Sequence, residues 1–281
     1  MVAKTDYSPE LIKKLENMAR QLRIDVIEMI HCRGQGHPGG SLSPAEIMSV
    51  LFFHSLRLDS KNPKWENRDR FILSKGHASA ILYAALAHRG YLSAEELKTF
   101  GCIGSRLQGH PDWKKTPGVD MTSGCLGHGI NIGAGLCLAA KLNGLDYYTY
   151  VLLGDGELQA GVLWEGAMLA AKYKLSNFIA IVDYNGVQLD GTIEEIMPLE
   201  PLKSKWESFG WSVLEIDGHS VPEVLEALDS ARASRDKPTV IIAHTVKGKG
   251  ASFMEGKAAW HGRAITDEEY EQAMKELKQN G

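Results

Sequence analysis

The chain has 281 residues and a mass of 30.9 kDa, with 44% hydrophobic and 23% charged residues, a composition that excludes disorder, collagen and low-complexity sequence as descriptions of the whole chain. Its 31 lysine and arginine residues against 35 aspartate and glutamate residues give a net charge of -4, so electrostatics gives no reason to expect binding to nucleic acid or to an anionic membrane. The four cysteines lie far apart without a Cys-x-x-Cys pair, which favours neither a zinc site nor a disulfide framework and agrees with a reducing, cytoplasmic location.

The first part of the chain is predicted to be helical. Met1–Met18 contains no apolar run that would serve as a secretion signal. From Glu10 to Cys32, apolar residues recur at steps of three or four, which predicts a long amphipathic helix. A glycine-rich turn from Gly34 to Gly40 follows this helix. Ser43 is then the expected N-cap of a second helix, with Pro44 at its first position, that ends near Leu56.

Beyond this point, strands and helices alternate. Short apolar runs predict strands at Asp69–Ser74, Tyr147–Leu153, Phe178–Val182, Trp211–Ile216 and Thr239–Ala243. Helices are expected up to Gly90, after Ser93, at Gly127–Asn143, over about fifteen residues after the second strand, from Leu202, at Pro222–Ala233 and at 267–280. The segment Gly101–Ser123 is an expected long loop. This order predicts an α/β fold with a parallel sheet and helices on both faces, formed by residues 1–281 as one domain.

The most informative polar residues lie where two successive strands end. Gly154, Asp155 and Gly156 close one predicted strand, and Asn185 follows the next strand about thirty residues further on. Because the carboxyl ends of parallel strands meet at one edge of a sheet, both polar side chains are expected at the same edge. A carboxylate, an amide oxygen and a loop carbonyl suit Mg²⁺ or Ca²⁺ and leave positions for phosphate oxygens and water. Either turn alone is common without a ligand, so it is the pair that predicts a metal and diphosphate site.

This pattern resembles the thiamin diphosphate-binding motif, and four further segments resemble the transketolase family in sequence order. They are Gly36-His37-Pro38-Gly39-Gly40, Ser74-Lys75-Gly76-His77, Gly109-His110-Pro111 and Trp260-His261-Gly262. The resemblance covers nearly the whole chain, and it implies the thiamin diphosphate-binding fold. A complete transketolase is more than twice as long, with a pyrimidine-binding domain and a third domain after the matched region. The chain is therefore similar to the separate N-terminal, diphosphate-binding subunit of a split transketolase.

The resemblance also implies roles for single residues. Asp155, Asn185 and the backbone carbonyl of Val187 would hold the metal ion. The residues that would contact the cofactor are His77, Gly124, Leu126, Gly154, Asp155, Gly156, Glu157, Asn185, Lys247 and His261. For Lys247, a merely solvated basic loop is the competing interpretation. His37, His110 and His261 would surround the ketose donor, since a neutral imidazole can bind hydroxyls and move the proton of the C3 hydroxyl.

Six of the ten histidines adjoin a glycine, which places them in turns rather than on helix faces. They are His37, His77, His110, His128, His219 and His261. A single histidine in a turn is usually a surface residue. Four of them at one edge of the sheet would instead form a site, and this is the expectation for His37, His77, His110 and His261.

In transketolases the glutamate that activates the cofactor belongs to the pyrimidine-binding domain. The sequence after Gly262 contains no candidate for it. The chain is therefore expected to be inactive alone. With a C-terminal subunit of about 300 residues that carries this glutamate, it would transfer a two-carbon ketol unit from a ketose phosphate to an aldose phosphate. The resemblance implies two copies of each subunit, a heterotetramer that serves the pentose phosphate pathway.

Two other functions stay open at this level. The cofactor-binding subunit of a 2-oxo acid dehydrogenase shares the Gly-Asp-Gly pattern, but the histidine segments favour a sugar donor. A non-catalytic diphosphate-binding scaffold is the second alternative. Relatives that act on sulfonated or branched sugars would use the same cofactor half, so the sugars stay open. Glu165 is expected at a contact between subunits, where Ala160 replaces a second glutamate of the family pattern.

Overall fold

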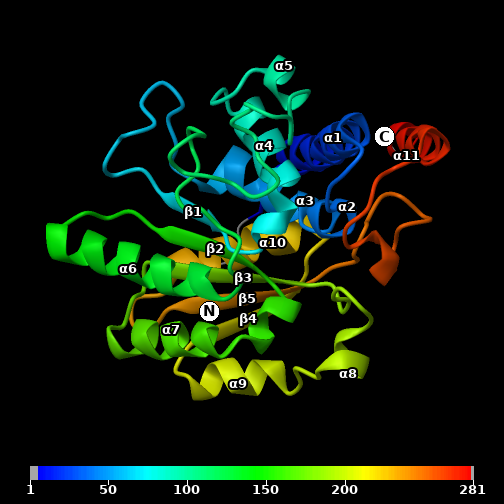
Figure 1. The fold of residues 1–281 in the computed structure, drawn as a ribbon. Helices are drawn as coiled ribbons and strands as arrows, with labels where there is room; N and C mark the ends of the chain where they lie inside the picture. The colour runs from blue at the N-terminus through cyan, green and yellow to red at the C-terminus, as the bar shows by residue number, and fades with distance from the viewer. Residues whose placement is uncertain (1–5, 280–281) are drawn as a thin grey trace.

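The computed structural model describes residues 6–279, which fold around a five-stranded parallel sheet (Figure 1). The strands are β1 (Arg70–Leu73), β2 (Thr149–Gly154), β3 (Phe178–Tyr184), β4 (Ser212–Asp217) and β5 (Thr239–His244), in the spatial order β1-β2-β3-β5-β4. All five predicted strands are confirmed, and each boundary lies within two residues of its expected position. The carboxyl ends of the strands therefore share one edge of the sheet.

Helices cover both faces of the sheet (Figure 1). One layer contains α1 (Pro9–Arg33), α3 (Ala45–Val50), α4 (Ser79–His88) and α10 (Val221–Ala233), with α11 (Asp267–Gln279) beside α1. The other layer contains α6 (His128–Asn143), α7 (Gly161–Lys172) and α9 (Leu202–Ser208). Successive strand residues alternate between two buried cores, with Leu152 in the first and Val151 in the second, because side chains along a strand point to opposite faces. The predicted α/β fold with helices on both faces is confirmed.

Three local predictions were wrong. The glycine-rich turn contains a short helix, α2 (Pro38–Leu42). Ser43 does not cap the second helix, because its hydroxyl donates to Asp183 on the sheet, and Pro44 is the N-cap of α3 instead. The helix expected directly after the second strand is divided into a 3-10 turn, Gly156–Gln159, and α7.

The remaining elements are the short helices α5 (Ala94–Leu97) and α8 (Ile193–Ile196), a π-helical turn (Leu51–Ser55) and two 3-10 turns (Gly76–Ala78 and Ala258–Trp260). Ser93 forms a capping box before α5. The expected terminal helix ends at Gln279 in the structure, and position 280 lies outside the described residues. No helix in residues 6–279 is long and apolar enough to cross a membrane. That residues 1–281 form a single domain stays a prediction.

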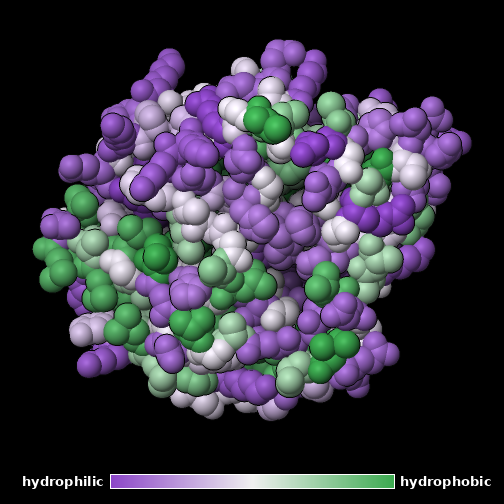
Figure 2. Space-filling model, in the orientation of Figure 1, coloured by the Kyte–Doolittle hydropathy of each residue, from purple (hydrophilic) through white to green (hydrophobic). Residues whose placement is uncertain are grey.

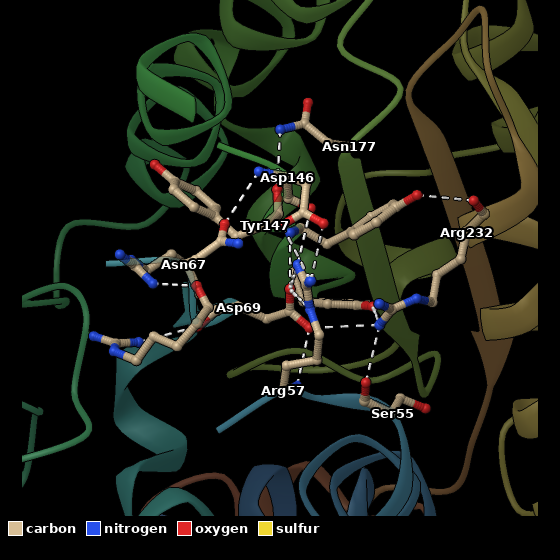
Figure 3. A network of polar contacts seen from close by, with 12 residues as sticks. Ser55, Arg57, Asn67, Asp69, Asp146, Tyr147, Asn177 and Arg232 are labelled. Carbon is tan, nitrogen blue, oxygen red and sulfur yellow. Dashed lines mark hydrogen bonds and ion pairs between the residues drawn. The ribbon is translucent and has the colours of Figure 1, made fainter. Parts of the chain in front are cut away.

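A buried carboxylate ties the amino ends of the strands together at the opposite edge (Figure 3). Asp69, immediately before β1, is fully buried and accepts hydrogen bonds from Arg57 at 3.0 Å and from the backbone N–H of Tyr148 at 2.9 Å. Arg232 of α10 donates to the Tyr150 hydroxyl at 2.7 Å and lies 3.5 Å from Asp69. A buried charge is tolerated only when it is paired, so this network holds the start of β1 against the start of β2.

Candidate active site

The two loops that follow β2 and β3 meet at the carboxyl edge of the sheet. Gly154 pairs with Asp183 in the sheet register, so the residues after them are neighbours. The Asp155 carboxylate accepts the N–H of Gly156 at 2.8 Å and the N–H of Gly186, from the other loop, at 2.6 Å. The structure thus brings together the two turns that the sequence paired.

A cavity of about 270 Å³ opens at this point. Its lining residues are Gly40, Lys75, His77, Leu126, Gly154, Asp155, Gly156, Glu157, Asn185, Val187, Gln188, Leu189, Lys247 and His261. Every residue expected at the metal or cofactor lines it except Gly124. A Cβ at Gly124 would lie 3.7 Å from the His110 ring, so this glycine lies beside the histidines instead.

The oxygen atoms in the cavity match the chemistry of a divalent cation. Asp155 is almost fully buried, and burial together with the nearby Asp183 raises its pKa to about 6, so a bound cation would stabilise its charged form. The Asn185 side-chain oxygen accepts the N–H of Val187 at 3.1 Å and keeps a second lone pair. Among residues 6–279, no three His, Cys, Asp or Glu side chains form a metal group. These few oxygens fit a hard cation whose other ligands come from water and a bound phosphate.

The Lys247 ammonium already occupies part of this polar pocket. It is buried and donates to the carbonyl oxygens of Val187 at 2.9 Å and Gln188 at 3.3 Å, and to Nδ1 of His261 at 3.0 Å. Burial lowers the pKa of Lys247 to about 8, which leaves it mostly protonated at pH 7. The Val187 carbonyl therefore already accepts a hydrogen bond from a cation, the Lys247 ammonium. This buried ammonium lies within reach of an anionic ligand in the cavity.

A buried ion pair beneath the cavity was not singled out from the sequence. Lys75 donates to the Asp183 carboxylate and, at 2.8 Å, to the carbonyl of Gly40. Asp183 also accepts hydrogen bonds from Ser43 and Thr245. Burial opposes the charge of Asp183, but Lys75 outweighs it and lowers the pKa of Asp183. Lys75 belongs to the Ser74-Lys75-Gly76-His77 segment, and Asp183 lies near the end of β3; neither position indicates that the two side chains form a pair.

Glu157 lines the cavity but is engaged by the protein. One carboxylate oxygen accepts hydrogen bonds from Ser74 and from the N–H of Gly127 at 2.7 Å, and the other accepts the N–H of Gly154 at 3.1 Å. Its carboxylate therefore accepts three hydrogen bonds and joins three segments around the site. That Glu157 contacts a cofactor stays a prediction, and the structure gives it a role in loop organisation.

Four of the six glycine-adjacent histidines converge, as expected. The ring centroids of His77 and His261 are 4.9 Å apart, and His37 lies 5.3 Å from His77, 5.7 Å from His261 and 6.2 Å from His110. Burial, with the charge of Lys247 next, lowers the pKa of His261 to about 4, and burial also lowers the pKa of His37 and His77. Such imidazoles are neutral at pH 7 and can accept protons.

Exposed apolar side chains surround the opening and continue over α6 and α7. Leu126 and Leu189 of the cavity wall are 41% and 58% exposed. Figure 2 shows hydrophobic residues gathered over α6, α7 and α8, and the exposed large ones there are Ile132, Leu142, Met168, Leu169, Tyr173, Ile196 and Met197. Glu165 is exposed among them on α7. Exposed apolar side chains gathered on one face are typical of a surface that contacts another protein.

Comparisons with known proteins agree with this geometry. Residues 13–280 match the family described as transketolase, thiamine diphosphate binding domain. The chain is 44% identical over 267 residues to the 6-deoxy-6-sulfo-D-fructose transketolase subunit SqwG of Clostridium sp. strain MSTE9, covering 95% of this chain and 97% of that protein. It is 41% identical over 268 residues to one subunit of the apulose-4-phosphate transketolase of Phocaeicola vulgatus, covering 95% of each chain.

Longer proteins match over the same region. The crystal structure of transketolase from Campylobacter jejuni superposes with a TM-score of 0.90 at 38% identity, covering 95% of this chain and 43% of that chain. Human transketolase is 39% identical over 267 residues, covering 42% of its length. The chain thus spans less than half of these transketolases and nearly all of the two subunits.

Proposed function

The chain belongs to the transketolase family through its thiamin diphosphate-binding domain, and from this premise we propose that it is the cofactor-binding subunit of a transketolase built from two different chains. The observation that carries this proposal is the match in length, since the chain covers 97% and 95% of two transketolase subunits but 42% of human transketolase. The cavity at the carboxyl edge, where Asp155 and Asn185 meet, supports the cofactor half of the function.

The reaction is the transfer of a two-carbon ketol unit from a ketose phosphate to an aldose phosphate. Thiamin diphosphate supplies the nucleophilic carbon for such a transfer when it is bound. Asp155, Asn185 and the Val187 carbonyl would hold Mg²⁺, or Ca²⁺, with the diphosphate. Lys247 would then leave the Val187 carbonyl and interact with the diphosphate, because its ammonium is a close match for a phosphate oxygen.

The histidine cluster would hold the sugar. Burial lowers the pKa of His37, so it offers a neutral ring nitrogen that can accept the proton of the donor's C3 hydroxyl. Nδ1 of His261 accepts from Lys247 in the structure, so His261 would take this role once Lys247 has moved to the diphosphate. His110 lies at the outer side of the cluster, 6.2 Å from His37, in a position to bind the C1 hydroxyl. His77, the ring closest to His261 at 4.9 Å, would face the diphosphate.

A partner subunit would close the site. The apolar surface beside the cavity supports such a cover, and Glu165 lies within that surface. The partner would carry the pyrimidine-domain glutamate, and two copies of each subunit would form the enzyme in the cytoplasm. Neither the structure nor the comparisons give any observation in favour of a 2-oxo acid dehydrogenase subunit or a scaffold.

Reconstitution tests the proposal. The purified chain with thiamin diphosphate, Mg²⁺, xylulose 5-phosphate and ribose 5-phosphate should give no turnover, and adding the co-purifying partner should restore it. Because the two subunit relatives are named for different sugars, 6-deoxy-6-sulfofructose and apulose 4-phosphate belong among the donors. Robust turnover without a partner, or release of labelled CO₂ from pyruvate with no ketol transfer, would overturn the proposal.

A further inference from the structure

The backbone segment that carries Lys247 is held in place from outside its own strand. It follows β5, and three of its backbone N–H groups donate to three different parts of the fold. The N–H of Thr245 donates to the Tyr184 carbonyl at 3.0 Å, and the N–H of Gly248 donates to the Gly39 carbonyl at 3.0 Å. Between them, the N–H of Val246 donates to a side chain, Nε2 of His219, at 2.9 Å.

The ring of His219 is fixed at both nitrogens. Since Nε2 accepts the Val246 N–H, the ring proton lies on Nδ1, which donates to the Glu46 carboxylate at 3.0 Å. Glu46 also accepts two hydrogen bonds from Arg23, at 2.6 and 2.7 Å. Burial opposes the charge of Glu46, but Arg23 and His219 outweigh it and lower its pKa to about 2. Glu46 is therefore a permanent acceptor that sets the tautomer of His219.

This chain of contacts reaches the cavity without touching its contents. Arg23 on α1 and Glu46 on α3 belong to the helical layer, and His219 lies between β4 and α10. Only the last member, the Val246 amide, adjoins a residue of the cavity wall, Lys247. The side chain of His219 is 16% exposed, so water competes weakly for its nitrogens.

We propose that His219 is a positioning residue for the cofactor: through the Val246 amide, it holds the backbone of Lys247 so that the ammonium lies in the diphosphate cavity. The proposal rests on the proposed function for the identity of the ligand. The anchoring of the Lys247 backbone by His219 does not depend on the proposed function, because it is a property of this chain alone. His219 contacts no group of the cavity, so its effect on the ligand passes entirely through Val246 and Lys247.

Two substitutions by amide side chains each keep one of the two hydrogen bonds of the His219 ring and remove the other. In His219→Asn, the side-chain amide can take the place of Nδ1 and bind Glu46, but it is too short to reach Val246. In His219→Gln, the amide oxygen can take the place of Nε2 and accept the Val246 N–H, while the bond to Glu46 is lost. His244→Gln, at an exposed histidine on the end of β5, is the matched control.

Two measurements on the full chain test the proposal. Amide hydrogen exchange without ligand should be about tenfold faster at Val246 in His219→Asn, and close to the parent chain in His219→Gln and His244→Gln. The dissociation constant of thiamin diphosphate with Mg²⁺, measured by calorimetry on each chain reconstituted with the partner subunit, should rise about tenfold in His219→Asn and less than threefold in the other two.

Each outcome decides one part of the reasoning. Unchanged exchange at Val246 in His219→Asn would overturn the anchoring. Faster exchange with unchanged affinity would overturn the link to the cofactor, and so would an equal or larger loss of affinity in His219→Gln. If the reconstituted parent enzyme binds no thiamin diphosphate, the proposed function and the link to the cofactor fail, and the exchange data still decide the anchoring.

Discussion

Asp155→Asn should have opposite effects on stability and on ligand binding. Burial and Asp183 raise the pKa of Asp155 from 3.8 to about 6, so at pH 7.5 the ionised side chain destabilises the metal-free folded state by about 3 kcal/mol. The substitution removes this charge. It also leaves one of the two donors, the N–H of Gly156 or of Gly186, without an acceptor, at a cost of about 1 kcal/mol.

The net expectation is a gain of about 2 kcal/mol for metal-free Asp155→Asn at pH 7.5, which corresponds to a rise of roughly 4 °C or more in Tm. Because the folded pKa is raised, the penalty on the parent chain is complete above pH 6 and is relieved as the pH falls toward 3.8. At pH 5 the difference between the two chains should therefore shrink to under about 1 kcal/mol.

Thermal unfolding followed by circular dichroism in EDTA, at pH 7.5 and pH 5, measures this difference. Thiamin diphosphate with Mg²⁺ should then raise the Tm of the parent chain at pH 7.5 and leave Asp155→Asn unchanged, which reverses the order of the two. Asp190→Asn, at an exposed position of the neighbouring loop, should behave like the parent chain throughout. The reasoning is refuted if metal-free Asp155→Asn is less stable than the parent chain, or if the ligand stabilises it equally.

Three further predictions concern the frame of the site. A Cβ at Gly129 would lie 2.2 Å from the Ser74 hydroxyl oxygen, whereas one at Gly135 on the same helix would meet nothing within 4 Å. Gly129→Ala should therefore lower the free energy of unfolding by about 3 kcal/mol, and Gly135→Ala should raise it by up to about 1 kcal/mol; equal values in urea unfolding would contradict the packing. Asp69→Asn should destabilise the chain by about 3 kcal/mol or more, since it removes the fully buried carboxylate that Arg57 and Arg232 share, and Arg57 keeps only its pair with the exposed Asp146. A loss below about 1 kcal/mol would show that the network is dispensable. His261 should titrate near pH 4, because burial and the neighbouring lysine lower its pKa; an NMR midpoint between pH 6 and 7 would contradict a buried ring next to the Lys247 ammonium.

The fold was largely predictable because each strand is a short apolar run between polar turns. Burial on both faces of a parallel sheet requires such runs, and Val151 and Leu152 in adjacent positions serve the two cores. Ser43 shows where local signals fail. Its sequence context is that of an N-cap, but a tertiary bond to Asp183 competes for the same hydroxyl and prevails. No sequence pattern near Ser43 predicts its hydrogen bond to Asp183, because the two residues are far apart in the sequence.

Some residues of the candidate site were also predictable from the sequence, and others were not. Asp155, Asn185 and the converging histidines were predictable, because strand ends of a parallel sheet share one edge and the residues there belong to family motifs. Lys75 and Asp183 were not singled out, since a lysine and an aspartate in separate segments carry no sign that they form a buried pair. The link from Glu46 through His219 to Val246 depends on three elements distant in the sequence, and it became visible only in the folded chain.

The central claim, that the loops at Asp155 and Asn185 hold a divalent ion with a diphosphate, is tested most directly by anomalous diffraction. Crystals of the chain with its partner subunit, thiamin diphosphate and Mn²⁺ in place of Mg²⁺ would locate the ion by its own signal. We predict one peak within about 2.5 Å of the Asp155 carboxylate, the Asn185 amide oxygen and the Val187 carbonyl, with Lys247 displaced from that carbonyl. A bound cofactor whose metal peak lies away from these three oxygens would contradict the account.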